Sequence, residues 1–466
     1  MATDVLPLPE EIRASESNSI LRPVSEKERI SNIDVLRGAA LLGIVLMNII
    51  FSGLPMAADF NPKVSGGSTG ANLLAFFLQY VFFDGKMRGL FSMMFGASTY
   101  LLVMRLDSRG AGLKSAQIYT RRLMWLMLFG IFHAYLIWHG DILYPYALLG
   151  LVLLPLLSAR PKGLLIAAGI LILFMTGGEI AQGFSLIKAH DKYVAAMKAE
   201  AAHQTLTDDQ KDAKKSWEDK RKYFSPSAQD LKKEREMYSG SYFHLLGARA
   251  ALVMKWHSSP YYMYGWDMFT MMLIGIAFVK TGVLSGDRSS PFYWRLMGIS
   301  YAVCIPIASI SFYLSWKAGF EPLQTVFNFS TYQLARIGTT FGHMSALLLM
   351  CKSGLFEGLR SRLAAIGQTA FSNYIIHSII YGLVFYGYGL NLFDKLQRYQ
   401  LYLVVLGMWI FSLIVSPIWL RHFRFGPLEW CWRSLTYWKR QPMRVHSPAV
   451  STTPVSFGDT LSGQTA

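Results

Sequence analysis

The stretch that decides the fold is Leu123–Trp138 (LMWLMLFGIFHAYLIW), the turn Trp138–Asp141 (WHGD) and Ile142–Leu157 (ILYPYALLGLVLLPLL). Each apolar run approaches the roughly 20 residues that a helix needs to cross a bilayer. A carboxylate at the centre of a spanning helix costs roughly 2.5–3.5 kcal/mol. We therefore predict two spanning helices joined by a turn, in which Asp141 either meets solvent at the membrane surface or contacts His133.

Apolar runs of similar length recur throughout the 466 residues, of which 52% are hydrophobic and 16% charged. A soluble domain carries about 25% charged residues, and the alternating ten-residue segments of a membrane β-barrel are absent from the sequence. We therefore predict an all-α, polytopic membrane protein with about ten transmembrane helices. The predicted helices are residues 36–54, 89–104, 121–138, 142–158, 163–182, 264–284, 293–316, 328–351, 364–388 and 400–420.

These helices divide into two bundles, residues 36–182 and 263–420. The apolar segment 73–85 in the first bundle is too short to span, so we expect it to be interfacial or re-entrant. Residues 183–262 are predicted to form a small helical insertion on the outer face, with a helix beginning at Thr207–Gln210, which resembles a capping box. The flanking regions are an N-terminal tail, 1–35, and a basic tail with a disordered end, 421–466.

The positive charge of the short loops predicts the orientation. Alternate short loops and the basic tail carry eighteen Lys and Arg, whereas the short loops of the other side carry four. Because cytoplasmic loops are enriched in Lys and Arg, both termini are predicted to lie in the cytoplasm. The same bias explains the net charge of +16 without nucleic acid as a partner.

Charged residues at two helix entrances are candidate ligand-binding groups. Asp34 and Arg37 share a face of the first helix at i, i+3 spacing, either as a simple ion pair or with Arg37 holding an anionic group. Lys86 and Arg88 precede the second spanning helix, where they either snorkel to the interface or bind a substrate.

His133 and Asp141 are the candidate catalytic pair, with Trp138 and His139 as neighbouring substrate-binding candidates. A carboxylate can orient an imidazole and stabilise its charged form, and such a histidine suits general-base chemistry on a hydroxyl or amine. The alternative is a hydrogen-bonded core histidine. No nucleophilic Ser or Cys motif accompanies the pair, so direct transfer from donor to acceptor is easier to picture than a covalent intermediate.

Two further helices carry polar stripes inside predicted spans. Gln333, Arg336, Thr340 and His343 share one face of residues 328–351, and Gln368, Asn373 and His377 lie in residues 364–388. Such stripes face a bundle interior or a wet cavity, so we expect Arg336, His343, Asn373 and His377 to share a polar cavity with His133 and Asp141. The alternative is closed hydrogen bonding between helices. The three cysteines have no metal spacing, and no metal is expected.

Five motifs together resemble those of YeiB-type bacterial membrane proteins. They are Asp34–Gly38 with Asn48, Gly85–Gly96, Trp138–Leu143 with Tyr146, Phe371–Tyr374, and Gly426–Arg433. The matches extend from about residue 29 to 444. The helical layout of that family is similar to that of the transmembrane acyltransferases, which include the lysosomal enzyme that acetylates heparan glucosamine. That enzyme's catalytic histidine follows its first spanning helix, and this sequence has no histidine between 54 and 132 to match it.

The resemblance implies an acyl-CoA donor from the cytoplasm and a small-molecule, glycan or lipid acceptor on the far side. Cytoplasmic arginines are candidates to attract a CoA phosphate, although positive-inside topology explains them equally: Arg105, Arg121, Arg122, Arg360 and Arg362. Two rival functions stay open. One is a transporter or channel for a small polar or lipidic solute, and the other is a non-catalytic membrane partner. A homodimer is compatible with the sequence but is not indicated by any motif.

Overall fold

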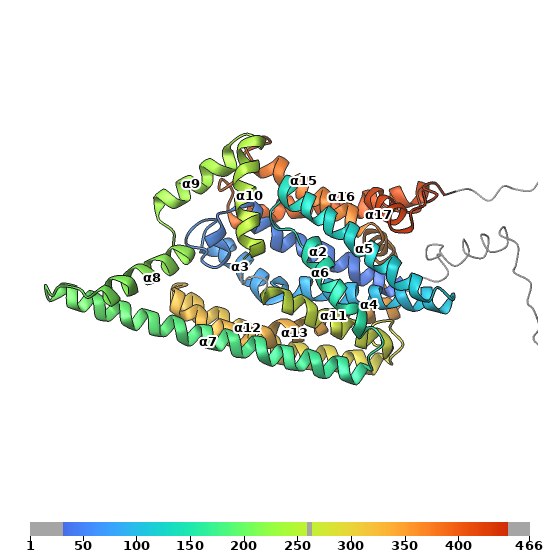
Figure 1. The fold of residues 1–466 in the computed structure, drawn as a ribbon, viewed down its shortest axis with the longest axis horizontal. Coiled ribbons are helices and arrows are strands. Elements are labelled where there is room, and N and C mark those ends of the chain that lie inside the picture. The colour runs from blue at the N-terminus through green and yellow to red at the C-terminus, as the bar shows by residue number, and fades with distance from the viewer. Residues whose placement is uncertain (1–30, 259–262, 446–466) are drawn as a thin grey trace, which may run out of the picture.

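The structure is a computed structural model that describes residues 31–258 and 263–445, and it contains no β-strand within those ranges. The fold class is therefore all-helical, as predicted (Figure 1). The tails 1–30 and 446–466, including the predicted disordered end, lie outside the described residues. The helices are α2 (Ser31–Gly53), α3 (Gly70–Leu78), α4 (Lys86–Ser108), α5 (Leu113–Phe132), α6 (Leu143–Leu153), α7 (Pro161–Ala201), α8 (Asp208–Phe224), α9 (Ala228–Ser239), α10 (Tyr242–Ser258), α11 (Met263–Lys280), α12 (Ser290–Lys317), α13 (Pro322–Lys352), α14 (Glu357–Gln368), α15 (Ala370–Phe385), α16 (Arg398–His422) and α17 (Pro427–Tyr437).

Six helical segments in the described ranges are long and apolar enough to cross a membrane. They are Ser31–Gly53, Gly70–Ser108, Pro161–Ala201, Ser290–Lys317, Ser330–Lys352 and Arg398–His422. The other four predicted spans coincide with shorter or less apolar helices, namely α5, α6, α11 and the pair α14 and α15. The protein is thus an all-helical membrane protein, and a count of ten crossings stays a prediction.

Three predicted boundaries are corrected by the structure. Segment 73–85 is not separate from the second span: α3 and a π-helical turn, Gln79–Phe83, lead into α4 through Gly85, whose φ of +68° suits glycine. The predicted helix 364–388 is interrupted at Thr369, between α14 and α15. Helix α7 does not end near residue 182 but continues to Ala201, so that its total length is 41 residues, or about 60 Å.

The described part of the predicted insertion is helical, and it returns to the bundle. Figure 1 shows α7 and α8 extending beyond the end of the bundle as a hairpin, with α9 leading back. The predicted capping box is confirmed, because Thr207 and Gln210 satisfy each other's backbone N–H groups at the start of α8. On α10, Tyr242 and Arg249 both donate to the carbonyl of Leu136, directly before the Trp138–Asp141 turn.

Two glycines bring α2 and α14 into backbone contact. A Cβ on Gly367 would lie 1.9 Å from the carbonyl oxygen of Asp34, and one on Gly38 would lie 2.0 Å from that of Leu363. Both separations are far below any real contact, so only glycine permits this approach. The contact places Arg37 beside the interruption between α14 and α15, where it donates to the Gly367 carbonyl at 3.2 Å.

Gly367→Ala is therefore expected to push α14 away from α2 and to lower the free energy of unfolding by roughly 1–3 kcal/mol, as overpacking does. The midpoint of thermal unfolding of the detergent-purified protein measures the effect. Gly298→Ala in α12 is the matched control, because a Cβ there meets no atom within 4 Å in the described structure. Equal midpoints for the two variants would contradict the proposed close contact.

Candidate functional site

A cavity of about 240 Å³ lies where α2, α4, α5, α6, α15 and α17 meet. One part of its wall is basic and the other is apolar and aromatic. Its lining residues include Asp34, Arg37, Leu41, Ile44, Phe91, Phe95, Ser98, Arg105, Arg122, Leu123, Leu126, Ile142, Leu143, Tyr146, Phe371, Tyr374, Glu429, Trp432 and Arg433. The cavity therefore has chemically distinct ends.

The basic end lies near the beginning of α2 and the end of α4. Four guanidinium groups line it, from Arg37, Arg105, Arg122 and Arg433. The predicted pair of Arg37 with Asp34 is confirmed, with 2.7 Å between Nη1 and Oδ1, and Arg37 also donates to Ser98 at 2.6 Å. Arg122 lies over the Trp432 ring, 3.5 Å from its centroid. Only two lining carboxylates, Asp34 and Glu429, oppose these four cations, so this end suits an anionic group.

The aromatic end of the cavity is formed by Tyr146 and Tyr374. The Tyr374 hydroxyl donates to the carbonyl of Gly140 and accepts from the N–H of Ile142, each at 3.3 Å. The other side of the Tyr374 ring faces His133, with 5.0 Å between ring centroids. Tyr374 thus both lines the cavity and covers His133, which is buried.

His133 and Asp141 are in direct contact. Nδ1 of His133 lies 2.8 Å from Oδ1 of Asp141, so the predicted contact across the turn is present. Both side chains are almost completely buried, and Asp141 therefore does not meet solvent. On the other side of the ring, Nε2 lies 2.9 Å from the hydroxyl oxygen of Ser378 on α15. Asp141, His133 and Ser378 form a continuous array.

The local chain geometry explains this arrangement. The last turn before Trp138 is π-helical, His133–Ile137, and the chain then becomes extended at Trp138, with φ of −155°. Single π-helical turns often occur at functional sites. The N–H of Tyr144, in the first turn of α6, donates to Oδ2 of Asp141 at 2.7 Å. Asp141 therefore caps α6 with one oxygen and holds His133 with the other.

Ser378 is not indicated by any sequence pattern. It follows His377 in a helix whose polar positions suggested only a stripe, and no local pattern distinguishes a nucleophilic serine from one that bonds its own backbone. Its hydroxyl also lies 3.2 Å from the carbonyl of Tyr374, one turn earlier. Only the packing of α15 against the π-helical turn identifies its relation to His133.

Glu429 on α17 caps the beginning of α15. Oε1 accepts from the backbone N–H groups of Phe371 and Ser372, at 2.6 and 3.1 Å, and Oε2 accepts from the Ser372 hydroxyl at 2.5 Å. These are the N–H groups that a new helix leaves unpaired. Burial raises the pKa of Glu429, and the hydrogen bonds from Ser372 and Phe371 partly oppose that rise. The cap explains why the predicted span 364–388 is interrupted.

Lys86, which is buried, and Arg88, which is partly exposed, make their contacts away from the cavity. Lys86 is 2% exposed and donates to the Tyr80 carbonyl at 2.6 Å, so the snorkelling interpretation is wrong for it. Arg88 pairs with Asp267 on α11 at 2.7 Å, and Arg336, which is fully buried, pairs with the other oxygen of the same carboxylate. Asp267, which the sequence reasoning did not select, thus joins two predicted site residues.

The remaining stripe residues make closed contacts. His343 lies 2.7 Å from both the Tyr301 hydroxyl and the Phe82 carbonyl. Asn373 donates to Thr369 and Ser416, and Nε2 of His377 lies 2.9 Å from the Ser412 hydroxyl. None of these residues lines the 240 Å³ cavity. The expectation of one shared polar cavity is therefore wrong, because these side chains bond to different neighbouring helices at separate places.

Some of the other predicted groups line the cavity and the rest lie outside it. Arg105 and Arg122 line the cavity, whereas Arg121 stacks over Trp438, and Arg360 and Arg362 donate to backbone carbonyls elsewhere. Trp138 and His139 are buried beside His133, with 6.4 Å between the centroids of Trp138 and His133. Within the described ranges, no group of three or more His, Cys, Asp or Glu side chains is placed to hold a metal ion.

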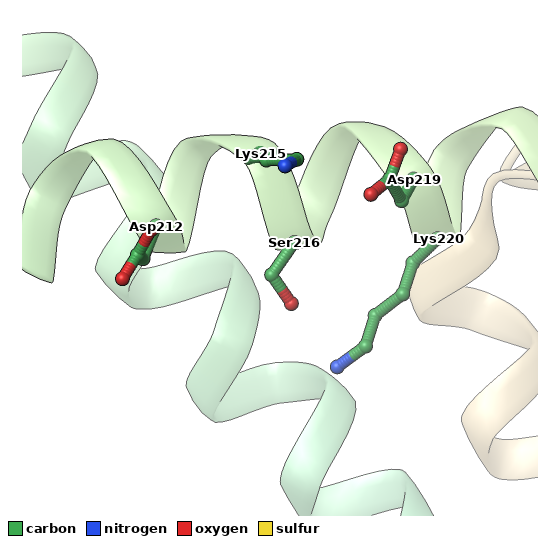
Figure 2. Close-up of a pocket in the computed structure, with 5 residues that line it drawn as sticks. All are labelled: Asp212, Lys215, Ser216, Asp219 and Lys220. Carbon is green, nitrogen blue, oxygen red and sulfur yellow. The ribbon is translucent and has the colours of Figure 1, made fainter.

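A second hollow, of about 480 Å³, lies on α8 and is open to solvent. Asp212, Lys215, Ser216, Asp219 and Lys220 line it, all from one helix (Figure 2). Figure 2 shows Ser216 and Lys220 directed toward a neighbouring helix while the charged groups of both signs lie apart. These side chains are mostly exposed, which is typical of a solvated helix face and not of an active site.

Fold and cavity together define an all-helical membrane protein with a polar array buried in its helix bundle. The family model "Protein of unknown function (DUF418)" matches residues 278–439. "Uncharacterized protein YxaH" of Bacillus subtilis (strain 168) is 29% identical over 91% of this chain and 98% of its own length. "Uncharacterized protein YeiB" of Escherichia coli (strain K12) is 29% identical over 91% of this chain and 99% of its own. The predicted resemblance to YeiB-type proteins is confirmed by these matches. No solved structure matches it significantly.

The five motifs that carried this resemblance meet at the same cavity. They contribute Asp34 and Arg37, Phe91 and Phe95, Ile142 with Leu143 and Tyr146, Phe371 and Tyr374, and Glu429 with Trp432 and Arg433. Segments separated by about 400 residues therefore build one site. This convergence identifies the cavity and the adjoining His133 array as the candidate functional site.

Glu429→Ala is expected to uncap α15 and to lower the free energy of unfolding by about 1–3 kcal/mol, because buried N–H groups lose their acceptor. Hydrogen exchange at the backbone amides of Phe371 and Ser372 should become faster. Glu357→Ala, in the exposed first turn of α14, is the matched control and should leave those amides unchanged. Unchanged protection in the Glu429 variant would show that the carboxylate is not the cap.

Proposed function

We propose that this protein is a transmembrane acyltransferase that takes an acyl group from acyl-CoA and passes it to an acceptor from the opposite side of the membrane. The observation that carries the proposal is the order of groups along one path. Four arginines come first, then an apolar cavity, then Tyr374, and behind Tyr374 lies the His133–Asp141 pair. A donor whose anionic group binds the arginines and whose apolar arm enters the cavity would match this order of groups.

The donor is matched by the chemistry of the cavity. Guanidinium groups bind phosphate through paired, charge-assisted hydrogen bonds, and CoA carries its phosphates at the end away from the thioester. Apolar side chains, including Leu41, Ile44, Leu123 and Leu126, line the space beyond. A cavity of 240 Å³ is smaller than the roughly 300–1,000 Å³ of sites that enclose a drug-sized ligand. The nucleotide would therefore stay at the arginine end while the acyl arm enters.

His133 is proposed as the general base, and Asp141 as the group that orients it. The contact with Asp141 fixes the ring and stabilises the imidazolium that forms when the base takes a proton. Because Tyr374 covers the ring, its side chain must move for substrate to reach His133. Lys86 and Arg88, expected to bind the acceptor or an oxyanion, are held by Tyr80 and Asp267 instead, and we assign them no role in the transfer.

The proposed orientation follows from the loop charges. The end of the bundle with Arg37, Arg105, Arg122 and Arg433 would face the cytoplasm, where acyl-CoA is available, and α8 to α10 would lie outside. Both termini would then be cytoplasmic in the inner membrane of a bacterium. The acceptor would reach the array from the side that α10 covers.

Arg122→Ala is expected to weaken acyl-CoA binding about 10- to 100-fold, which is the worth of one charge-assisted contact. Calorimetric titration of the purified protein in lipid nanodiscs measures the dissociation constant. Arg362→Ala removes the same charge at the same end of the bundle, from an exposed residue outside the cavity, and should bind like the wild type. Absence of binding by the wild type would remove the donor, and a solute flux assay would then test the transporter.

His133→Ala is expected to reduce acyl transfer by at least about a hundredfold, since a general base supplies roughly 10²–10⁴-fold in rate. Asp141→Asn keeps an amide oxygen for the N–H of Tyr144 but then presents its NH2 group to Nδ1 of His133. This favours the imidazole tautomer that has no lone pair at Nε2, so a comparable loss is expected. Turnover of acyl-CoA with an added acceptor is the measurement, and unchanged acyl-CoA affinity shows that the variant is folded. Wild-type turnover in the His133 variant would exclude that residue from the mechanism.

A further inference from the structure

We infer that Ser378 is the nucleophile of a two-step transfer, in which the acyl group rests on the protein between donor and acceptor. The inference rests on the proposed acyltransferase function and replaces the direct transfer expected from the sequence. It is carried by the position of the Ser378 hydroxyl, 2.9 Å from the ring nitrogen of His133 that Asp141 does not contact. All three side chains are buried.

The direction of each hydrogen bond follows from the contacts of Asp141. A carboxylate only accepts hydrogen bonds, and the two oxygens of Asp141 face Nδ1 of His133 and the N–H of Tyr144. The neutral imidazole therefore carries its hydrogen on Nδ1 and presents a lone pair at Nε2. Ser378 has a single hydroxyl hydrogen, and both Nε2 of His133 at 2.9 Å and the Tyr374 carbonyl oxygen at 3.2 Å lie within its reach. When the hydroxyl turns to donate to Nε2, the arrangement is the one by which a base activates a serine nucleophile.

A second serine–histidine contact in the same bundle shows what distinguishes Ser378. Ser412 on α16 lies 2.9 Å from Nε2 of His377, the same distance as in the first pair. However, Nδ1 of His377 has no hydrogen-bond partner among the described residues. No carboxylate orients that ring or stabilises its charged form. Only the pair at His133 has all three members of a nucleophile, base and orienting group.

Ser378 is also suitably placed along the path. It lies one helical turn beyond Tyr374 on α15, and its hydroxyl is 3.2 Å from the Tyr374 carbonyl. Tyr374 lines the cavity, so an acyl arm that displaces this ring meets Ser378 next. On the other side, Trp138 and the α10 residues that bond Leu136 cover the array. A serine at this position can receive the acyl group from one side and release it to the other.

The chemistry is balanced without further reactants. Oγ of Ser378 attacks the thioester carbonyl carbon, the C–O bond forms, and the C–S bond breaks. The hydroxyl proton moves to Nε2 of His133 and then to the departing CoA sulfur, which leaves as a thiol. In the second step the acceptor hydroxyl or amine gives its proton to Nε2 and attacks the serine ester. The acyl group moves to the acceptor, and Ser378 regains its proton.

The test is to incubate the purified protein with acyl-CoA in the absence of acceptor and to measure the mass of the intact protein. The wild type should gain the mass of one acyl group, located on Ser378 by peptide mapping. Ser378→Ala should gain none and should lose turnover by about a thousandfold or more, as triad nucleophiles do. Ser412→Ala removes the matched hydroxyl and should form the adduct like the wild type.

Two further results distinguish a failure of this inference from a failure of the proposed function. Turnover by Ser378→Ala within about tenfold of the wild type, or an adduct on another residue, would overturn the nucleophile and leave a direct transferase. If the wild type binds no acyl-CoA, both proposals fail. Should the alanine variant not fold, Ser378→Cys keeps the size of the side chain. A hydroxylamine-sensitive thioester on that variant supports the inference, and a folded variant without one overturns it.

Discussion

The constraint on which this structure depends is that a polar group inside a bilayer must find its partner within the protein, because no water is present to pair it. The protein meets this requirement with separate small clusters, each between neighbouring helices. Arg88 and Arg336 share the carboxylate of Asp267, and His343 is held by Tyr301 and the Phe82 carbonyl. Such clusters fix how helices pack, and their closure explains why most of the predicted polar residues do not line a shared cavity.

The contact of Asp141 with His133 differs from these clusters because it leaves the second ring nitrogen of His133 available to another side chain. One oxygen of Asp141 caps α6 and the other orients the imidazole. The requirement to pair a buried carboxylate therefore produces a histidine with a fixed ring and a free lone pair. That lone pair faces a serine, whereas the comparable ring of His377 has no orienting carboxylate. A structural necessity of the membrane thus creates the one arrangement in the described bundle that resembles an activated nucleophile.

Sequence patterns were sufficient for the fold class and for contacts within a few residues. Apolar runs indicated the helical membrane protein, and spacing alone gave the Asp34–Arg37 pair and the Thr207 cap. The contact of His133 with Asp141 was also accessible, because a short turn brings the two helices together. Contacts between segments that are far apart in the sequence could not be predicted in this way. The cap of α15 by Glu429 joins residues 57 and 58 positions apart, and Ser378 lies 245 residues from His133. Periodicity places residues on a face but cannot say which helix that face meets.

The separation of the arginine end from the His133 array has a consequence for how the site works. An open channel between them would admit water and ions across the membrane, and a permanently closed one would prevent chemistry. Tyr374 resolves this conflict, because its hydroxyl is tied by two long hydrogen bonds of 3.3 Å to the backbone of the turn that carries Asp141. Breaking those bonds costs little compared with moving a helix. We propose that a ligand filling the cavity displaces this ring and replaces it as the seal, so that access to His133 and Ser378 opens only when the cavity is occupied.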